Sequence, residues 1–331
     1  MMRRRLSVIL LAVGAVALTI GGKAIAGQES GRPAAESAGA EWRWESYGDV
    51  QLRVPGSWAQ ALWTGPADCS EDDWVPEATV FRPGGMRSTA LKLCPAAKPA
   101  QQVAPSVVFG GERVGVVPLA GGWIRETRKI GEQLVTVTAG DDVLRRQIFD
   151  SAGVVASVDS YGCAPRADRR VARPPAQGGL KSVGDVTGVS VCRYSIEGLP
   201  IAPTGSPEDI RFARLQASSR LSGVAADHLV RDLVAAPPGA GPEITDPHRC
   251  APEPRPDPGH EFLILRVQGS EHAQDVIYRY DGCHDNGTDD SSVRRQLTAD
   301  TARQLFVGVH QVNQSYPALD KLLIGTPPPV R

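Results

Sequence analysis

The residues best suited to chemistry in this sequence lie in one stretch, 275–297, which reads DVIYRYDGCHDNGTDDSSVRRQL. His284 and Asp285 are adjacent there, and Asp289 and Asp290 follow shortly after. A histidine beside a carboxylate can serve as a general base, because the carboxylate orients the imidazole and stabilises its charged form. We interpret these four residues as a candidate surface site, an exposed acidic rim with one histidine.

Two metal sites are conceivable in the same stretch, and neither is favoured. An acidic loop offers the oxygen ligands that Ca²⁺ prefers, but its spacing differs from that of an EF-hand, and its Asn-Gly pair is typical of a turn. A zinc site would require adjacent cysteine and histidine ligands, which makes tetrahedral geometry awkward. We therefore predict no metal and no cofactor. The residues weighed are Asp285, Asn286, Asp289 and Asp290 for calcium, and His248, Cys250, Cys283 and His284 for zinc.

The common catalytic motifs are missing from the sequence. There is no G-x-S-x-G elbow, S-x-x-K pair, H-E-x-x-H helix, P-loop or dinucleotide fingerprint. All six histidines lie at or beyond His228, so the first half of the chain has no histidine base. We predict no catalytic residues. The alternative is an enzyme with an unfamiliar site near His284 and Asp285.

The N-terminal segment determines the expected location of the protein. Arg3 to Arg5 precede an apolar run at 6–20, and Ala24-Ile25-Ala26 matches the small-x-small pattern that signal peptidase recognises. The sequence predicts export with cleavage after Ala26, and an uncleaved N-terminal anchor is the alternative. Residues 27–40 are small and polar, which predicts a disordered linker.

Export gives meaning to the six cysteines, because an even number in an oxidising compartment predicts disulfides. Six cysteines allow about 15 pairings, and spacing alone does not choose among them. We prefer the sequential set, in which each bridge closes a loop of a few tens of residues. The preferred pairs are Cys69–Cys94, Cys163–Cys192 and Cys250–Cys283.

Composition and pattern predict an α+β protein with two domains, each an antiparallel sheet packed by one or two helices and stapled by disulfides. The first domain is expected at 41–153, with a hairpin across Gly131 and a helix capped by Asp141 or Asp142. We expect Val143, Leu144 and Ile148 on the inner face of that helix and Arg145 on its outer face.

The second domain is expected at 154–318, before a Pro-rich tail at 319–331. This boundary places two cysteines in the first domain and four in the second. Glu261 to Val267 is predicted to be the central strand, with 275–280 beside it as a hairpin. We expect Ser222 to cap one helix and Thr298 to cap the last one. Arg294 and Arg295 are expected to form ion pairs with Asp289 and Asp290.

Two resemblances extend this picture. The segments GVSVCRY, GPEITDPHRC and YDGCHDNGTDD, followed by RRQLT, resemble a group of exported actinobacterial proteins of unknown function. The segment YGDVQLRVPGSW, with a helix after a VTV strand, is similar to the opening of PsbP-like lipoprotein domains. The second resemblance implies an antiparallel sheet covered by helices and used for binding. Neither resemblance implies catalytic residues.

These observations converge on an exported protein of the cell envelope, secreted or anchored to the plasma membrane, that binds or scaffolds an envelope or extracellular partner. The net charge of −1 argues against a nucleic-acid partner. Contact with the membrane is expected only through the N-terminal segment, if that segment is retained. A membrane-tethered extracytoplasmic sensor is a further alternative.

Overall fold

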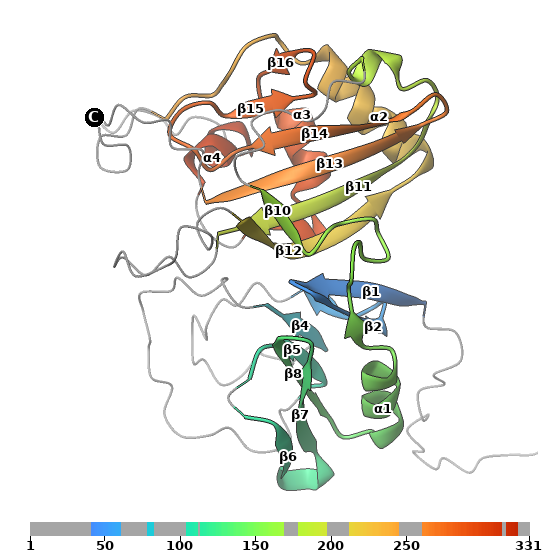
Figure 1. Ribbon diagram of the computed structural model, residues 1–331. Coiled ribbons are helices and arrows are strands. Elements are labelled where there is room, and N and C mark those ends of the chain that lie inside the picture. Colours follow the sequence, from blue (N-terminus) through green and yellow to red (C-terminus); the bar gives the residue numbers. More distant parts are fainter. Residues whose placement is uncertain are drawn as a thin grey trace, which may run out of the picture. The chain divides into compact units, whose positions relative to one another are not determined.

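The computed structural model describes residues 41–60, 78–82, 104–111, 113–168, 178–196, 212–244, 260–312 and 316–323 (Figure 1). Residues Ala40–Arg331 form one compact unit, separate from residues Met1–Gly39. The expected signal peptide or anchor and the expected linker lie outside the described residues. No helix among the described residues is long and apolar enough to span a membrane.

The first part of the described chain builds a three-stranded sheet in the order β1-β2-β9. The alternating sequence VQLRV directs Val50, Leu52 and Val54 inward with no exposed surface, and it leaves Arg53 exposed. Gly48 adopts a φ of +55° in the turn that joins the first two strands, a conformation that favours glycine. The strands are β1 (Trp42–Tyr47), β2 (Val50–Pro55) and β9 (Gly153–Val154).

A six-stranded sheet in the order β3-β4-β5-β8-β7-β6 follows. The predicted hairpin is confirmed: its two strands pair antiparallel and turn at Gly131. The sheet is mixed, because its first three strands run parallel to one another. The strands are β3 (Ala59–Gln60), β4 (Thr79–Phe81), β5 (Ser106–Phe109), β6 (Gly115–Pro118), β7 (Ile124–Ile130) and β8 (Gln133–Ala139); a short 3-10 turn, η2 (Ala120–Gly122), separates β6 from β7.

Helix α1 (Asp142–Asp150) begins where the sequence predicts, with the Asp141 carboxylate accepting hydrogen bonds from the backbone of Val143 and Leu144. Its inner face differs from the prediction. Arg145 is buried and Val143 is 54% exposed. The reason is electrostatic: Glu126 on β7 lies 2.9 Å from the Arg145 guanidinium and draws this long side chain onto the sheet.

The second part of the described chain forms a seven-stranded antiparallel sheet in the order β10-β12-β11-β13-β14-β15-β16. β13 is its central strand and pairs with β14 as a hairpin, as the sequence predicts. The strands are β10 (Arg166–Asp168), β11 (Val186–Ser195), β12 (Phe212–Leu221), β13 (Glu261–Gly269), β14 (Ala273–Arg279), β15 (Gly287–Asp289) and β16 (Arg294–Arg295).

The two faces of this sheet are covered differently. Leu263, Leu265 and Val267 point into a large core shared with the helices, whereas Cys192 and Tyr194 belong to a smaller core on the other face. Figure 1 shows the helices gathered on one side of the strands. The helical elements of this part are η3 (Leu180–Ser182), α2 (Gly223–Ala235), α3 (Ala299–Leu305), η4 (Gly308–His310) and α4 (Pro317–Leu323).

The C-terminal helices differ from the sequence prediction. Thr298 caps α3 as expected, but α3 ends at Leu305 and is not the last helix. Gly308 adopts a φ of +55°, a left-handed conformation that does not continue a helix. α4 then extends into the segment predicted to be a tail, because Leu319 is buried in the core. Ser222 occupies the cap position of α2, although its side chain makes no capping hydrogen bond.

The predicted domain boundary before Val154 stays a prediction. Val154 pairs with Val50 of β2, so β9, which ends at Val154, belongs to the first sheet. Both sets of strands lie within one compact unit.

Candidate functional site

The acidic stretch predicted to form a surface rim is mostly buried. Asp289 is 3% exposed and Asp290 is 1% exposed. His284 is exposed, and Asp285 next to it forms an ion pair with Arg294 at 3.0 Å. The exposed part of the expected rim is therefore only His284 with its half-buried neighbour Asp285. The burial of the other two carboxylates corrects the prediction.

Asp290 is a structural junction within the second part of the chain. Its carboxylate accepts hydrogen bonds from the backbone of Leu180, Ser292 and Val293 at 2.7–3.1 Å. It also pairs with the buried Arg295 guanidinium at 3.1 Å, which confirms one of the predicted ion pairs. Burial opposes the charge, but these donors prevail and lower the pKa of Asp290 to about 2. The carboxylate thus ties η3 to the loop between β15 and β16.

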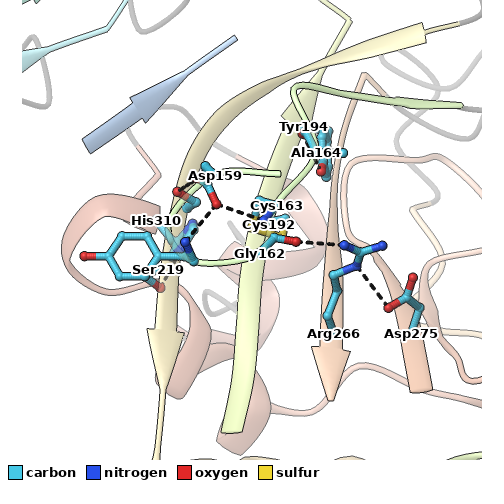
Figure 2. The surroundings of a disulfide bond; sticks show 12 residues. Asp159, Gly162, Cys163, Ala164, Cys192, Tyr194, Ser219, Arg266, Asp275 and His310 are labelled. Carbon is cyan, nitrogen blue, oxygen red and sulfur yellow. Dashed lines mark hydrogen bonds and ion pairs between the residues drawn. A yellow bond between two sulfur atoms is a disulfide. The ribbon is translucent and has the colours of Figure 1, made fainter. Parts of the chain in front are cut away.

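A second buried group surrounds the predicted Cys163–Cys192 disulfide, which is confirmed (Figure 2). The Asp159 carboxylate accepts hydrogen bonds from the Cys163 backbone at 2.8 Å and from the Ser218 hydroxyl. Arg266 donates to the Gly162 carbonyl at 2.8 Å. Strands β11, β12 and β13 thereby hold the segment that precedes β10. The Asp159 carboxylate and the Arg266 guanidinium are both engaged by the chain itself, so we interpret them as structural.

The other cysteines are only partly described. Cys283 is disulfide-bonded, and its partner lies outside the described residues. Cys69, Cys94 and Cys250 also lie outside them, so the pairs Cys69–Cys94 and Cys250–Cys283 stay predictions. The disulfides that the structure contains support an oxidising, extracytoplasmic environment.

A third group, which we call the arginine cluster, consists of Arg43, Glu45, Arg82, Arg193 and His310. Glu45 on β1 is 1% exposed and lies 2.6 Å from the Arg43 guanidinium; it also forms an ion pair with Arg82, which follows β4. Arg82 in turn interacts electrostatically with Arg193 of β11. The cluster therefore combines residues from the first sheets and from the seven-stranded sheet.

Three hydrogen bonds hold these elements together. The amide of Gly48, in the turn after β1, donates to the carbonyl of Leu215 on β12 at 2.7 Å. Farther along β12, the Ser219 hydroxyl lies 2.8 Å from Nε2 of His310. Arg193 donates to the backbone carbonyl of Gln311 at 3.2 Å, which fixes its guanidinium near His310.

The charges of the arginine cluster do not balance. Among the five residues of the cluster, three guanidinium groups accompany the one carboxylate of Glu45, an excess of two positive charges with His310 neutral. Glu261 is the next carboxylate, and it and Arg193 both act on Tyr280. His310 is neutral because burial, and then the charges of Arg193 and Arg82, hold its pKa well below the ordinary value. Burial likewise lowers the pKa of Arg82, although Glu45 opposes this effect.

Several polar atoms of this group have no hydrogen-bond partner despite being buried. They include Nη2 of Arg43, Nε of Arg193 and Nδ1 of His310, together with the hydroxyl of the neighbouring Ser46. Ser46 is 0% exposed and His310 is 2% exposed. Buried polar groups are nearly always paired, because an unpaired one costs about 1–3 kcal/mol. Unpaired donors around a positive excess are suited to holding an anion.

The Ser219–His310 contact is poorly suited to nucleophilic catalysis. In serine hydrolases a carboxylate accepts a hydrogen bond from Nδ1 of the histidine, and here Nδ1 has no partner. The neighbouring arginines also weaken His310 as a base, since they lower its pKa. The arrangement therefore favours binding of an anion over removal of a proton from serine.

No sequence motif predicts the arginine cluster. Each of its arginines is placed in an apolar or aromatic context, in WRWE, VFRP and VCRY. An arginine flanked by strand-forming apolar residues is a candidate buried charge, because its neighbours on the strand are themselves buried. That signal marks single residues and does not indicate which of them meet in space.

Comparisons of the chain with protein-family models, with curated proteins and with solved structures found no match.

Proposed function

We propose that this protein is an exported, non-catalytic binding module of the cell envelope, and that the arginine cluster holds an anionic group of its ligand or partner. One observation supports this proposal. The cluster has two positive charges in excess, and buried nitrogens of Arg43, Arg193 and His310 in the same place have no hydrogen-bond partner. An anion would supply both the missing charge and the missing acceptors.

Access to the cluster is most direct at Arg43. Its side chain is 25% exposed, whereas that of Arg82 is 10% exposed and that of Glu45 is 1% exposed. An anion that approaches from solvent meets Arg43 first and then the deeper groups. Arginine suits this role, because its planar guanidinium presents paired donors that match a carboxylate or phosphate.

The proposal is tested by thermal unfolding of residues 40–331 in inorganic phosphate, sulfate or succinate, with glucose as the uncharged comparison. Binding to the folded state raises its stability by about 2.7 kcal/mol when the anion is at 100 times its Kd. We expect at least one anion to raise the Tm and glucose to leave it unchanged. Calorimetric titration then gives the affinity.

A matched pair of variants locates the site. Arg193→Gln removes a cluster guanidinium, whereas Arg220→Gln removes an exposed arginine on the neighbouring strand. We expect Arg193→Gln to weaken anion binding about tenfold or more, because charge-assisted hydrogen bonds contribute about 1.5–3 kcal/mol each. Arg220→Gln should bind as the wild type does. Equal affinity of both variants, or no anion effect at all, would remove the support for this function.

We further propose that the chain reaches the envelope through its N-terminal segment and that residues 1–26 are removed. The support is the small-x-small pattern that ends at Ala26 and the disulfides of the folded part. The intact mass of the native protein decides between secretion and a retained anchor. A mass that includes residues 1–26 would replace secretion with tethering.

A further inference from the structure

The β6–β7 hairpin carries an apolar segment that no part of the described chain covers. Residues 114–124, VGVVPLAGGWI, contain no charged side chain. Val114 is 56% exposed, Val116 is 60% exposed and Val117 is 49% exposed. Large exposed apolar side chains that are adjacent in a soluble fold mark an interaction surface more often than isolated ones do.

The exposure follows from the position of β6. This strand is at the edge of the six-stranded sheet and pairs only with β7 among the described strands. Val116 lies opposite Glu126, and Val117 lies opposite Arg125, so the two valines point to opposite faces of the hairpin. Both remain exposed, which means that neither face of β6 is packed. The turn at η2 forms the tip, and the ring of Trp123 packs against Gly140 beside it.

The charges around the segment are predominantly basic. Residues 113–130 contain four basic side chains, Arg113, Arg125, Arg128 and Lys129, and one acidic side chain, Glu126. Glu126 is engaged by Arg128 at 2.7 Å and by Arg145 at 2.9 Å. The exposed charged side chains from Arg113 to Lys129 are therefore cationic, and the acidic residues Glu112 and Glu132 stand just beyond them in the sequence.

We propose that this hairpin docks the folded protein on an anionic lipid surface. Val114, Val116 and Val117 would enter the interfacial region, and Trp123 would lie at its boundary, where its amphipathic ring is favoured. Arg113, Arg125 and Lys129 would contact anionic headgroups, which attract basic residues close to a surface. This contact is separate from the N-terminal segment and uses a different part of the chain from the arginine cluster.

The experiment is sedimentation of residues 40–331, which form a compact unit of their own, with two kinds of vesicle. One is phosphatidylcholine alone, and the other contains phosphatidylglycerol at roughly 30%, chosen to provide a negative surface potential. We expect binding to the second kind, and we expect 0.5 M salt to weaken it, since screening shortens the range of the attraction to roughly 4 Å.

Two variants separate the apolar contribution from general surface charge. Val116→Glu with Val117→Glu places charges on the hairpin, and Val224→Glu places one on an equally exposed valine of α2, which is 69% exposed. We expect the hairpin variant to lose about tenfold or more in vesicle affinity and the α2 variant to lose less than about twofold. Unchanged binding of the hairpin variant, or no binding by the wild type, overturns the proposal.

A second copy of the chain is the competing occupant of this edge, because an exposed edge strand can pair with itself. Light scattering on the same samples distinguishes the two. If the wild type is a dimer, the hairpin variant is a monomer and neither binds vesicles, then the edge is a homodimer interface and the lipid proposal is wrong.

Discussion

Asp290 and the arginine cluster both place charge inside the protein, but they differ in how that charge is compensated. Asp290 receives backbone donors from three residues and a guanidinium from Arg295. In the arginine cluster, Arg193 and His310 each retain a buried nitrogen without a partner. A buried charge whose partners are all supplied by the chain stabilises a local structure. A buried cluster with spare donors retains capacity for an external group, at some cost in stability.

The largest effect is expected at the satisfied site. Asp290→Ala leaves the Arg295 guanidinium buried without its partner, so we expect a loss of about 3–5 kcal/mol in the free energy of unfolding. Asp300→Ala is the control, because Asp300 is 75% exposed in its ion pair with Arg303 and should lose less than about 1 kcal/mol. Urea denaturation measures both. If Asp290→Ala and Asp300→Ala lose similar free energies of unfolding, then the charge of Asp290 is not compensated as described.

The disulfide cluster belongs with Asp290 in this comparison, because the carboxylate of Asp159 is also satisfied by the chain. Cys163 and Cys192 are 29 residues apart in sequence. Replacing both with alanine should destabilise the fold by about 3–4 kcal/mol, mainly by restoring the entropy of the unfolded chain. We expect anion affinity to stay unchanged, because the side chain of Cys192 lies in the smaller core even though Arg193 is the next residue of β11. A concurrent loss of affinity would show that the two regions are not independent.

The dependence of stability on pH gives a smaller test of how well the charge of Asp290 is compensated. The pKa of Asp290 is about 2 in the folded protein and ordinarily 3.8, so the charged form is favoured in the folded state. The resulting stability, about 2 kcal/mol, is present above pH 3.8 and is lost as the pH falls toward 2. Asp290→Asn should remove this part of the pH dependence. If wild type and variant lose stability in parallel between pH 4 and 2, the carboxylate does not contribute as described.

The smallest effect is expected at a pair of buried serines. Ser218 donates to Asp159, whereas the Ser46 hydroxyl has no partner. Ser218→Ala should cost about 1–3 kcal/mol, because Asp159 loses a donor. Ser46→Ala should change stability by less than about 0.5 kcal/mol or raise it, since no hydrogen bond is lost. Ser46→Ala should also weaken anion binding. A large destabilisation by Ser46→Ala would mean that its hydroxyl is paired in solution.

Local sequence signals predicted much of the fold. The hairpin at Gly131, the cap at Asp141, the central strand at Glu261 and the Cys163–Cys192 bridge depend on short patterns or on cysteine order, and each is confirmed. The errors have a common cause. Arg145 was placed outside because helical periodicity does not register Glu126, which lies across the sheet.

The sites were harder to predict for the same reason. The burial of DDS at 289–291 cannot be judged from composition, because polar residues near a turn are usually solvated. In the folded protein Asp289 and Asp290 are buried. The arginine cluster joins β1, β11 and η4, which are far apart in sequence. Its excess charge exists only after these elements meet, so no local pattern contains it.

The disulfide has a mechanical consequence. A pull on the first sheets is transmitted along the chain after β9 and reaches Cys163 before it reaches β10, the edge strand of the seven-stranded sheet. At Cys163 the load passes through a covalent bond to Cys192 in β11, two places inside the edge (Figure 2). The load therefore does not break the hydrogen bonds between β10 and β12 one after another. Under traction, the seven-stranded sheet would therefore resist as a whole rather than open strand by strand from its edge.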